Sequence, residues 1–173
     1  MAEPFRYNRT MIALHWLTAA LIATAWIGAQ VIDFFPRDLR MPVRSTHILL
    51  GLILAATLLV RVAVRLTSPP VPPANAGLFE RIAQLGHILL YILMAAVVLI
   101  GMGYAFVRGE TLYGLVSLAA YAPADRSWRH LVGEWHELAA NAILIVAGGH
   151  AAAALVHHYV LRDGLLRRMM PAA

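Results

Sequence analysis

Four long apolar stretches limit how this chain can fold more than any other feature of its sequence. They run from about Met11 to Ile32, from Ile48 to Val64, from Ile82 to Val107 and from Leu138 to Leu161. Since a helix rises about 1.5 Å per residue, each stretch is long enough to cross the roughly 30 Å hydrocarbon core of a bilayer. The pattern therefore predicts an all-α, integral-membrane four-helix bundle.

Composition favours a single membrane domain over residues 1–173. Hydrophobic residues make up 61% of the chain and charged residues 13%, whereas a soluble domain is about 45–50% apolar and about 25% charged. The proline-rich segment from Thr67 to Asn75 cannot continue a helix, and we interpret it as a short linker within this domain. The longest connection, residues 108–130, has no pattern that predicts its structure.

The first stretch could be mistaken for a signal peptide. Arg6 and Arg9 precede it, and Ala23-Thr24-Ala25 imitates a cleavage site. The apolar run continues well past that point, however, so we expect this stretch to be a membrane helix.

The fourteen basic residues are all arginines, and their placement predicts an orientation. They bracket the apolar stretches and do not form one face, which argues against nucleic-acid binding. With both termini in the cytoplasm, eight arginines lie inside and six outside, a weak preference by the positive-inside rule. The six outer arginines are matched by six outer acidic residues, so the surplus positive charge is cytoplasmic. The outer arginines are Arg37, Arg40, Arg44, Arg108, Arg126 and Arg129.

Eight histidines in so apolar a chain are functional candidates, because an ionisable group within a membrane span is costly. A single histidine could merely line a helix end. The depth of each histidine in the membrane and its angle around the helix axis must therefore be considered together. His136 and His150 are fourteen residues apart, which is ~21 Å of rise and nearly four full turns, so they face the same way. His157 returns to that face seven residues later, whereas His158 points away by about 100°.

Histidines on the other stretches can be matched to these by depth. His47 opens the second stretch from the outside as His136 opens the fourth, so the two share an outer layer. His15 and His87 open the first and third stretches from the inside, near the level of His150. The inner layer therefore has several candidates, His157 included, and spacing alone leaves their pairing open.

Facing imidazoles at equal depth are what a six-coordinate haem iron requires, and the flat, apolar macrocycle suits the space between helices. Two layers predict two b-type haems. The chain has no cysteine, which excludes covalent haem attachment and iron–sulfur clusters. Zinc would need about four ligands at one point, and copper has no recognisable cluster of His and Met.

Other residues could support such a site. Arg61, fourteen residues after His47, reaches the inner layer and could pair with a haem propionate, or it could equally be a snorkelling charge at a helix end. Glycines stand where helices would approach a haem closely, although ordinary packing of membrane helices also favours small residues. These glycines are Gly51, Gly101, Gly148 and Gly149.

The chain resembles the bacterial cytochrome b561 family over its whole length. The fourteen-residue histidine spacing on the fourth stretch is its most specific feature, and that spacing also marks related cytochrome subunits of membrane hydrogenases and formate dehydrogenases. By this resemblance His15 pairs with His150 and His47 with His136, which leaves His87 and His157 unligated. The other residues on which the resemblance rests are Trp16, Phe34-Phe35-Pro36-Arg37, Gly86, Trp135, Glu137, Asn141, the run from Ala151 to Tyr159, and Leu166 to Pro171.

The resemblance also implies an activity in the bacterial inner membrane, that of a superoxide:quinone oxidoreductase. The outer haem would take an electron from superoxide at the periplasmic face, and the inner haem would deliver it to ubiquinone. Outer arginines could steer the small anion, although the outer acids weaken that field. These are Arg37, Arg40, Arg44, Arg126 and Arg129.

On the inner side, His157 is the candidate for delivering protons to the quinone, with His158 and His87 as further candidates, because histidine titrates in the useful range. No carboxylate lies in mid-membrane, so we expect electron transfer without proton pumping.

Two other interpretations stay open. The chain could be a haem-b subunit that relays electrons between a separate periplasmic redox protein and the quinone pool, and it would then copurify with that partner. It could also be a non-enzymatic membrane carrier of haem or metal, with a readily exchanged ligand. The compact length and short loops favour the self-contained oxidoreductase.

Overall fold

The computed structural model describes residues 6–69, 77–118 and 125–170. Four long helices form the fold: α1 (Arg9–Val31), α2 (Arg37–Thr67), α3 (Leu78–Arg108) and α4 (Arg126–Val156). Each is long and apolar enough to cross a membrane, so the expectation of four helices of membrane-spanning length is confirmed. The helices run past most of the predicted limits, because helical hydrogen bonding continues into the polar ends of each stretch. Most of the proline-rich linker and residues 119–124 of the long connection lie outside the described residues.

Several short elements join or end the helices. A single turn of 3-10 helix, η1 (Ile32–Phe34), follows α1, and two strands, β1 (Thr111–Leu112) and β2 (Val116–Ser117), form an antiparallel hairpin after α3. A π turn, η2 (His157–Leu161), ends α4, and a 3-10 turn, η3 (Leu166–Met169), lies near the C-terminus.

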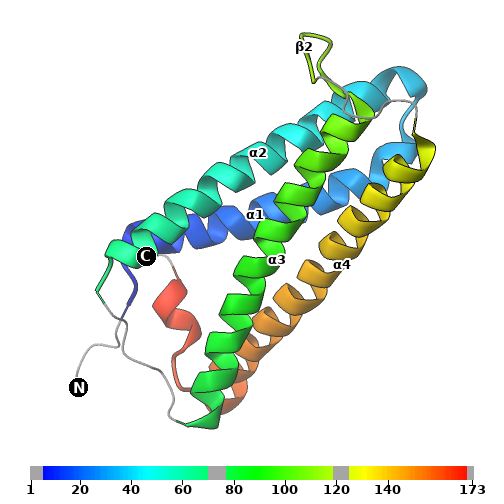
Figure 1. Ribbon diagram of the computed structural model, residues 1–173. Helices are drawn as coiled ribbons and strands as arrows, with labels where there is room; N and C mark the ends of the chain where they lie inside the picture. Colours follow the sequence, from blue (N-terminus) through cyan, green and yellow to red (C-terminus); the bar gives the residue numbers. More distant parts are fainter. Residues whose placement is uncertain (1–5, 70–76, 119–124, 171–173) are drawn as a thin grey trace.

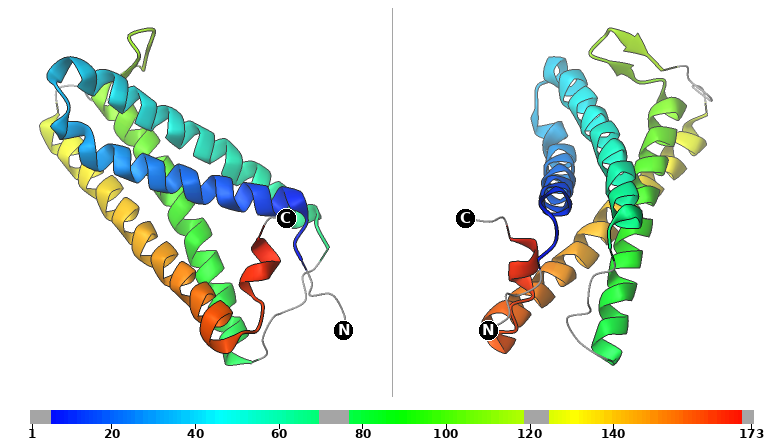
Figure 2. Two further views of the ribbon diagram at one scale, coloured as in Figure 1. Left: turned by 180° about the vertical axis from the view of Figure 1, so that it is seen from behind. Right: turned by 90° about the vertical axis from the view of Figure 1, so that its left-hand side faces the viewer.

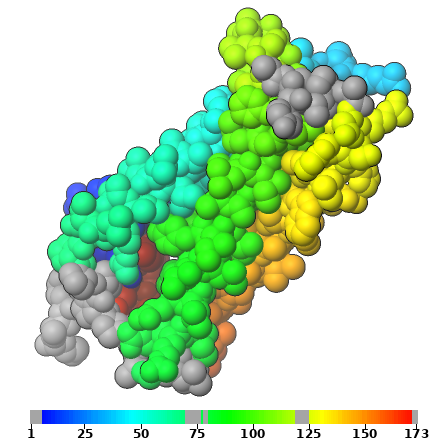
Figure 3. Space-filling view, in the orientation of Figure 1, coloured from blue at the N-terminus to red at the C-terminus, as the bar shows by residue number. Residues whose placement is uncertain are grey.

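The helices form two antiparallel pairs. α1 packs along α2 and α3 along α4, and α2 also contacts α3. The two pairs cross at an angle, as the right-hand view of Figure 2 shows, and they diverge toward the end that carries both termini (Figure 1). The C-terminal segment lies in this divergence and is visible in red between the ends of α2 and α3 in Figure 3. We call the hairpin end outer and the opposite end inner.

Side chains close the outer end around the start of α2. Ser45, which is 1% exposed, accepts a hydrogen bond from the Tyr113 amide and donates one to the Thr111 carbonyl. Glu110 bonds to the guanidinium groups of both Arg44 and Arg108. The hairpin is thereby fixed to α2 only two residues before His47.

Midway between the ends, an apolar layer joins the helices. Leu58 of α2, Met94 of α3 and Ile143 of α4 are its buried centre, and Ile22 of α1 packs against them. In sequence Ile143 lies seven residues from both His136 and His150. The layer therefore separates the two levels at which α4 carries inward-facing histidines.

Candidate functional site

The structure brings His47 and His136 together at the outer level. Their ring centroids lie 6.0 Å apart with the ring planes at 90°. Nδ1 of His47 is 2.9 Å from the Ala25 carbonyl oxygen, to which it must donate because a carbonyl can only accept. The proton of a neutral His47 is thus on Nδ1, and Nε2 keeps its lone pair for a ligand.

His136 lies against a glycine that leaves it room. A Cβ built on Gly101 of α3 would fall 2.7 Å from Cε1 of His136, closer than van der Waals contact. Gly133 of α4 is similarly placed, since its Cβ would meet the Tyr104 hydroxyl at 3.0 Å. Nδ1 of His136 is buried without a hydrogen bond of regular geometry to the described residues. Gly101 thus allows α3 to approach the imidazole of His136 closely, and its proposed approach to a haem stays a prediction.

The other glycines singled out in the sequence behave differently. A Cβ on Gly51, Gly148 or Gly149 would meet no atom within 4 Å. They do not serve close contacts between the helices described here.

Three imidazoles gather at the inner level. The ring centroid of His150 lies 6.4 Å from that of His15 on α1 and 5.1 Å from that of His87 on α3. The structure therefore places two of the inner candidates, His15 and His87, beside His150. His15 also contacts the indole of its neighbour Trp16, edge to face, at 5.5 Å.

Arg61 of α2 reaches into this inner group. Its terminal NH2 nitrogen is 3.1 Å from Nδ1 of His15, and its guanidinium carbon lies 5.3 Å from the centre of the Tyr91 ring. An arginine can only donate, so Nδ1 of His15 accepts this bond. Nε of Arg61 is buried without a partner among the described residues. Arg61 is thus a half-buried cation facing the histidines, and an acidic group is its natural complement.

One polar pair crosses the bundle between the two levels. The Trp26 indole of α1 donates to the Asn141 side-chain oxygen of α4 at 3.1 Å. α1 and α4 have no extensive direct packing, so this bond is a specific link between them.

At the inner end, His157 and His158 belong to the π turn. His157 bonds through Nδ1 to Asp163, and the His158 ring lies 4.7 Å from that of Tyr159, edge to face. Among the described residues, neither His157 nor His158 makes a ring contact with His15, His87 or His150.

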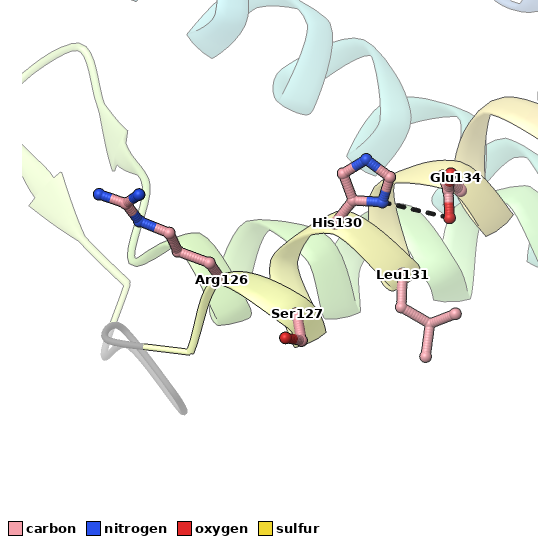
Figure 4. Close-up of a pocket in the computed structure, with 5 residues that line it drawn as sticks. All are labelled: Arg126, Ser127, His130, Leu131 and Glu134. Atoms are coloured by element: carbon pink, nitrogen blue, oxygen red, sulfur yellow. Dashed lines mark ion pairs between the residues drawn. The ribbon is translucent and has the colours of Figure 1, made fainter.

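The outer arginines differ in their partners. Arg40 bonds to Asp33, and Arg44 and Arg108 to Glu110, so acids hold these three. Arg126 and Arg129 instead line an open pocket of about 380 Å³ at the start of α4, together with Arg108 and His130. A neighbouring pocket of about 590 Å³ is shown in Figure 4, where His130 pairs with Glu134. Arg37 has no ion pair with any described residue.

Sequence reasoning missed three participants. Each of them forms a contact between segments that are distant in sequence or joined by a sharp turn. Glu110 is the partner of two arginines, Trp26 that of Asn141 and Asp163 that of His157. Only Asn141, a polar residue in an apolar run, gave a signal that a hydrogen bond was needed.

The donor set suits a haem better than a bare metal ion. Within the described ranges, no group of three or more His, Asp and Glu side chains converges as an ion site. Paired imidazoles are what a protein supplies when the remaining ligands belong to a porphyrin. An iron with about 2 Å bonds to an imidazole on each side needs ring centroids roughly 6 Å apart. The His47–His136 and His15–His150 pairs meet that separation.

A four-helix membrane bundle with paired histidines at two levels defines the class of membrane cytochromes b. A family model described as prokaryotic cytochrome b561 matches residues 6–172. The chain belongs to the prokaryotic cytochrome b561 family, whose members are membrane electron-transfer proteins that bind haem b.

Similar proteins cover the chain from end to end. A Yersinia pestis protein named "Probable superoxide oxidase CybB" is 32% identical over 170 residues, 96% of each chain. Cytochrome b561 homolog 1 of Escherichia coli is 29% identical over 171 residues, 96% of this chain and 97% of its own. Cytochrome b562 of Cereibacter sphaeroides is 32% identical over 176 residues, 98% of both chains.

Proposed function

We propose that this chain holds two b-type haems, one between His47 and His136 and one between His15 and His150, and passes electrons from the outer to the inner site. The observation that carries the proposal is the pair of facing imidazoles at each level, at 6.0 Å and 6.4 Å. The separation of His87 from His150, 5.1 Å, is shorter than a shared iron requires. His87 is therefore assigned a polar role beside the inner site.

Binding of a haem iron would require different changes in protonation at the outer and the inner level. His47 already carries its proton on Nδ1, held by the Ala25 carbonyl, which is the arrangement metal-bound histidines use. His15 accepts from Arg61 at Nδ1, so its proton lies on Nε2 when the ring is neutral. For His15 to ligate through Nε2 this proton must move to Nδ1 and Arg61 must turn away. A haem propionate would give Arg61 a negatively charged partner once its side chain has turned.

We propose further that superoxide is the electron donor at the outer side and ubiquinone the acceptor at the inner side. A haem at each site supplies one-electron redox chemistry. Two superoxide anions each give up one electron and leave as O2, and two electrons with two protons convert ubiquinone to ubiquinol. The name of the Yersinia pestis relative supports the donor. The arginines at the start of α4 support attraction of a small anion.

The same proposal orients the protein in the bacterial inner membrane with both termini in the cytoplasm. The outer end then faces the periplasm, where Arg37, Arg44, Arg126 and Arg129 would act on superoxide. The inner end carries His157, with His158 and His87 as further candidates for proton delivery to the quinone. Histidine is the side chain suited to this task near neutral pH.

Absorption spectra of the purified protein test this function. Superoxide added without quinone should reduce the haems rapidly, and a ubiquinone analogue added afterwards should reoxidise them. Haems that superoxide leaves oxidised would overturn the proposed donor and favour a subunit served by a separate redox protein. A protein that purifies with no stable low-spin haem would overturn the ligand assignment.

A further inference from the structure

The chain leaves α4 through a turn of uncommon geometry. In the π turn η2 the Arg162 amide bonds to the His157 carbonyl, and such turns occur frequently at functional sites. Arg162 then adopts a left-handed backbone conformation with φ of 54°, and Gly164 follows with φ of 76°. These turns reverse the chain and bring Asp163 against the imidazole of His157.

Two hydrogen bonds fix the Asp163 carboxylate. Oδ2 bonds to Nδ1 of His157 at 2.5 Å, and Oδ1 accepts from the Leu165 amide at 3.0 Å. Burial alone would raise the pKa of Asp163, but its bonds to His157 and Leu165 and the charge of Arg168 lower that pKa below its ordinary value. The carboxylate is therefore ionised at neutral pH. It holds a proton on Nδ1 of His157, and Nε2 is left as the position that exchanges protons.

The charged and titratable groups around this pair come from three segments. His158 and Arg162 flank it on the same turn, and Arg168 acts on Asp163 from η3. Tyr7 precedes α1, and its amide bonds to the Arg168 carbonyl at 3.2 Å. The basic groups near Asp163 favour its ionised form.

Residues Asp163–Met170, which we call the C-terminal strap, cross to the start of α1. The Trp16 indole donates to the Met169 carbonyl at 2.8 Å, and Arg6 donates to the Met170 carbonyl at 2.7 Å. Trp16 in turn contacts His15 of the inner level. The strap thus runs from the His157–Asp163 pair to a residue in contact with a proposed haem ligand.

We propose that Asp163 is a positioning residue for quinone reduction, whose carboxylate holds His157 in the tautomer and orientation that passes protons from the inner aqueous side to the quinone. The inference rests on the proposed function. For each quinone reduced, two electrons arrive through the haem sites and two protons pass singly through His157, each replaced from water. The alternative is that the pair only fastens the strap.

A stopped-flow experiment separates these roles. The haems of the full-length protein are first reduced with dithionite, and their reoxidation by a short-chain ubiquinone analogue is followed between pH 5.5 and 9. In Asp163→Asn, which keeps the shape but removes the charge, we expect reoxidation to be roughly 10–100-fold slower at neutral pH. The pH profile of the rate should change as well, because the asparagine amide no longer fixes the proton on Nδ1 of His157. Asp163→Glu should restore much of the rate.

Arg6→Gln is the matched control. It removes the bond from Arg6 to the Met170 carbonyl of the strap but leaves His157 and Asp163 intact, so its pH profile should be that of the wild type. An Asp163→Asn variant with wild-type rates at every pH would overturn the role of Asp163 and leave the proposed function standing. An Arg6→Gln variant that reproduces the slow rate and altered profile would overturn that role equally. Wild-type haems that quinone cannot reoxidise would overturn the proposed function and this inference with it.

Discussion

Nδ1 of His15 and the guanidinium of Arg61 lie 3.1 Å apart at the inner level of the bundle. The contact joins α1 to α2 and places a permanent cation beside an imidazole that is a proposed iron ligand. A fixed positive charge stabilises a reduced haem relative to its oxidised form, since the reduced form is the less positive.

Arg61→Gln should therefore lower the reduction potential of the inner haem, by an amount on the order of tens of millivolts. A potentiometric titration of the purified variant followed at the haem absorption bands measures the shift. Arg65→Gln removes an exposed arginine one turn further along α2 and is the control, which should shift the inner potential much less because solvent screens its charge. Equal shifts in the two variants would contradict a specific role for Arg61.

Single substitutions of the paired histidines should each remove one haem. His136→Ala should abolish the outer haem and His150→Ala the inner one, because an iron that loses an axial imidazole is held less tightly. Haem content relative to protein should fall to about one half in each variant, as a pyridine haemochrome assay would measure. His87→Ala provides the comparison and should retain both haems. Loss of a haem from His87→Ala instead would transfer the ligand role from His15 to His87.

Gly101→Ala should disturb the outer site through His136. The added Cβ would stand 2.7 Å from Cε1 of His136, so the imidazole must shift. We expect a lowered or altered outer-haem spectrum and a cost of about 1–3 kcal/mol in the free energy of unfolding, as for other overpacked sites. Gly103→Ala lies two residues away, where a Cβ meets nothing within 4 Å, and should leave the spectrum unchanged.

Arg126 and Arg129 should govern how fast superoxide arrives. Replacing both with Gln should slow haem reduction by superoxide on the order of 10-fold at low salt and flatten its dependence on ionic strength. Arg167→Gln, at the opposite end, should change neither quantity. Pulse-radiolysis rates at several salt concentrations make the comparison. A double variant as fast as the wild type would remove these arginines from the donor site.

The strap should loosen in acid. The folded-state pKa of Asp163 lies below its ordinary value of 3.8, so its ionised form stabilises the folded strap above that pH. This contribution is lost as the pH falls below 3.8 toward the lowered pKa. The protection factors of residues 163–170 against hydrogen exchange, which correct for the intrinsic pH dependence of exchange, should therefore fall at low pH in the wild type. Asp163→Asn should show lower protection already at neutral pH and no further loss of protection in this window.

The four helices could be predicted because apolar runs of this length have few alternatives in water or lipid. The His47–His136 approach followed from matching depths, since each opens a helix from the same side. Depth could not choose between His15 and His87, and the structure shows why: both rings lie within 6.4 Å of His150. A family resemblance, and now the separation that an iron requires, favour His15.

The hairpin and the strap had no comparable signal. Strands of two residues are too short to display alternation, and the bonds of Ser45 to the hairpin connect residues 66 and 68 positions apart. The approach of Asp163 to His157 depends on a π turn and on a left-handed backbone at Arg162. Arginine does not favour that conformation, so only the folded chain reveals it.

The apolar layer of Leu58, Met94 and Ile143 has an electrical consequence. Apolar side chains offer no hydrogen-bond partners to protons or ions, yet an electron can tunnel between cofactors on either side of such a layer. In the proposed direction, negative charge crosses the low-dielectric core alone and meets its protons on the cytoplasmic side. Each turnover would then be electrogenic, and moving each electron inward would cost about 2.3 kcal/mol for every 100 mV of membrane potential. Because of this apolar layer, the rate of electron transfer through the protein would depend on the membrane potential.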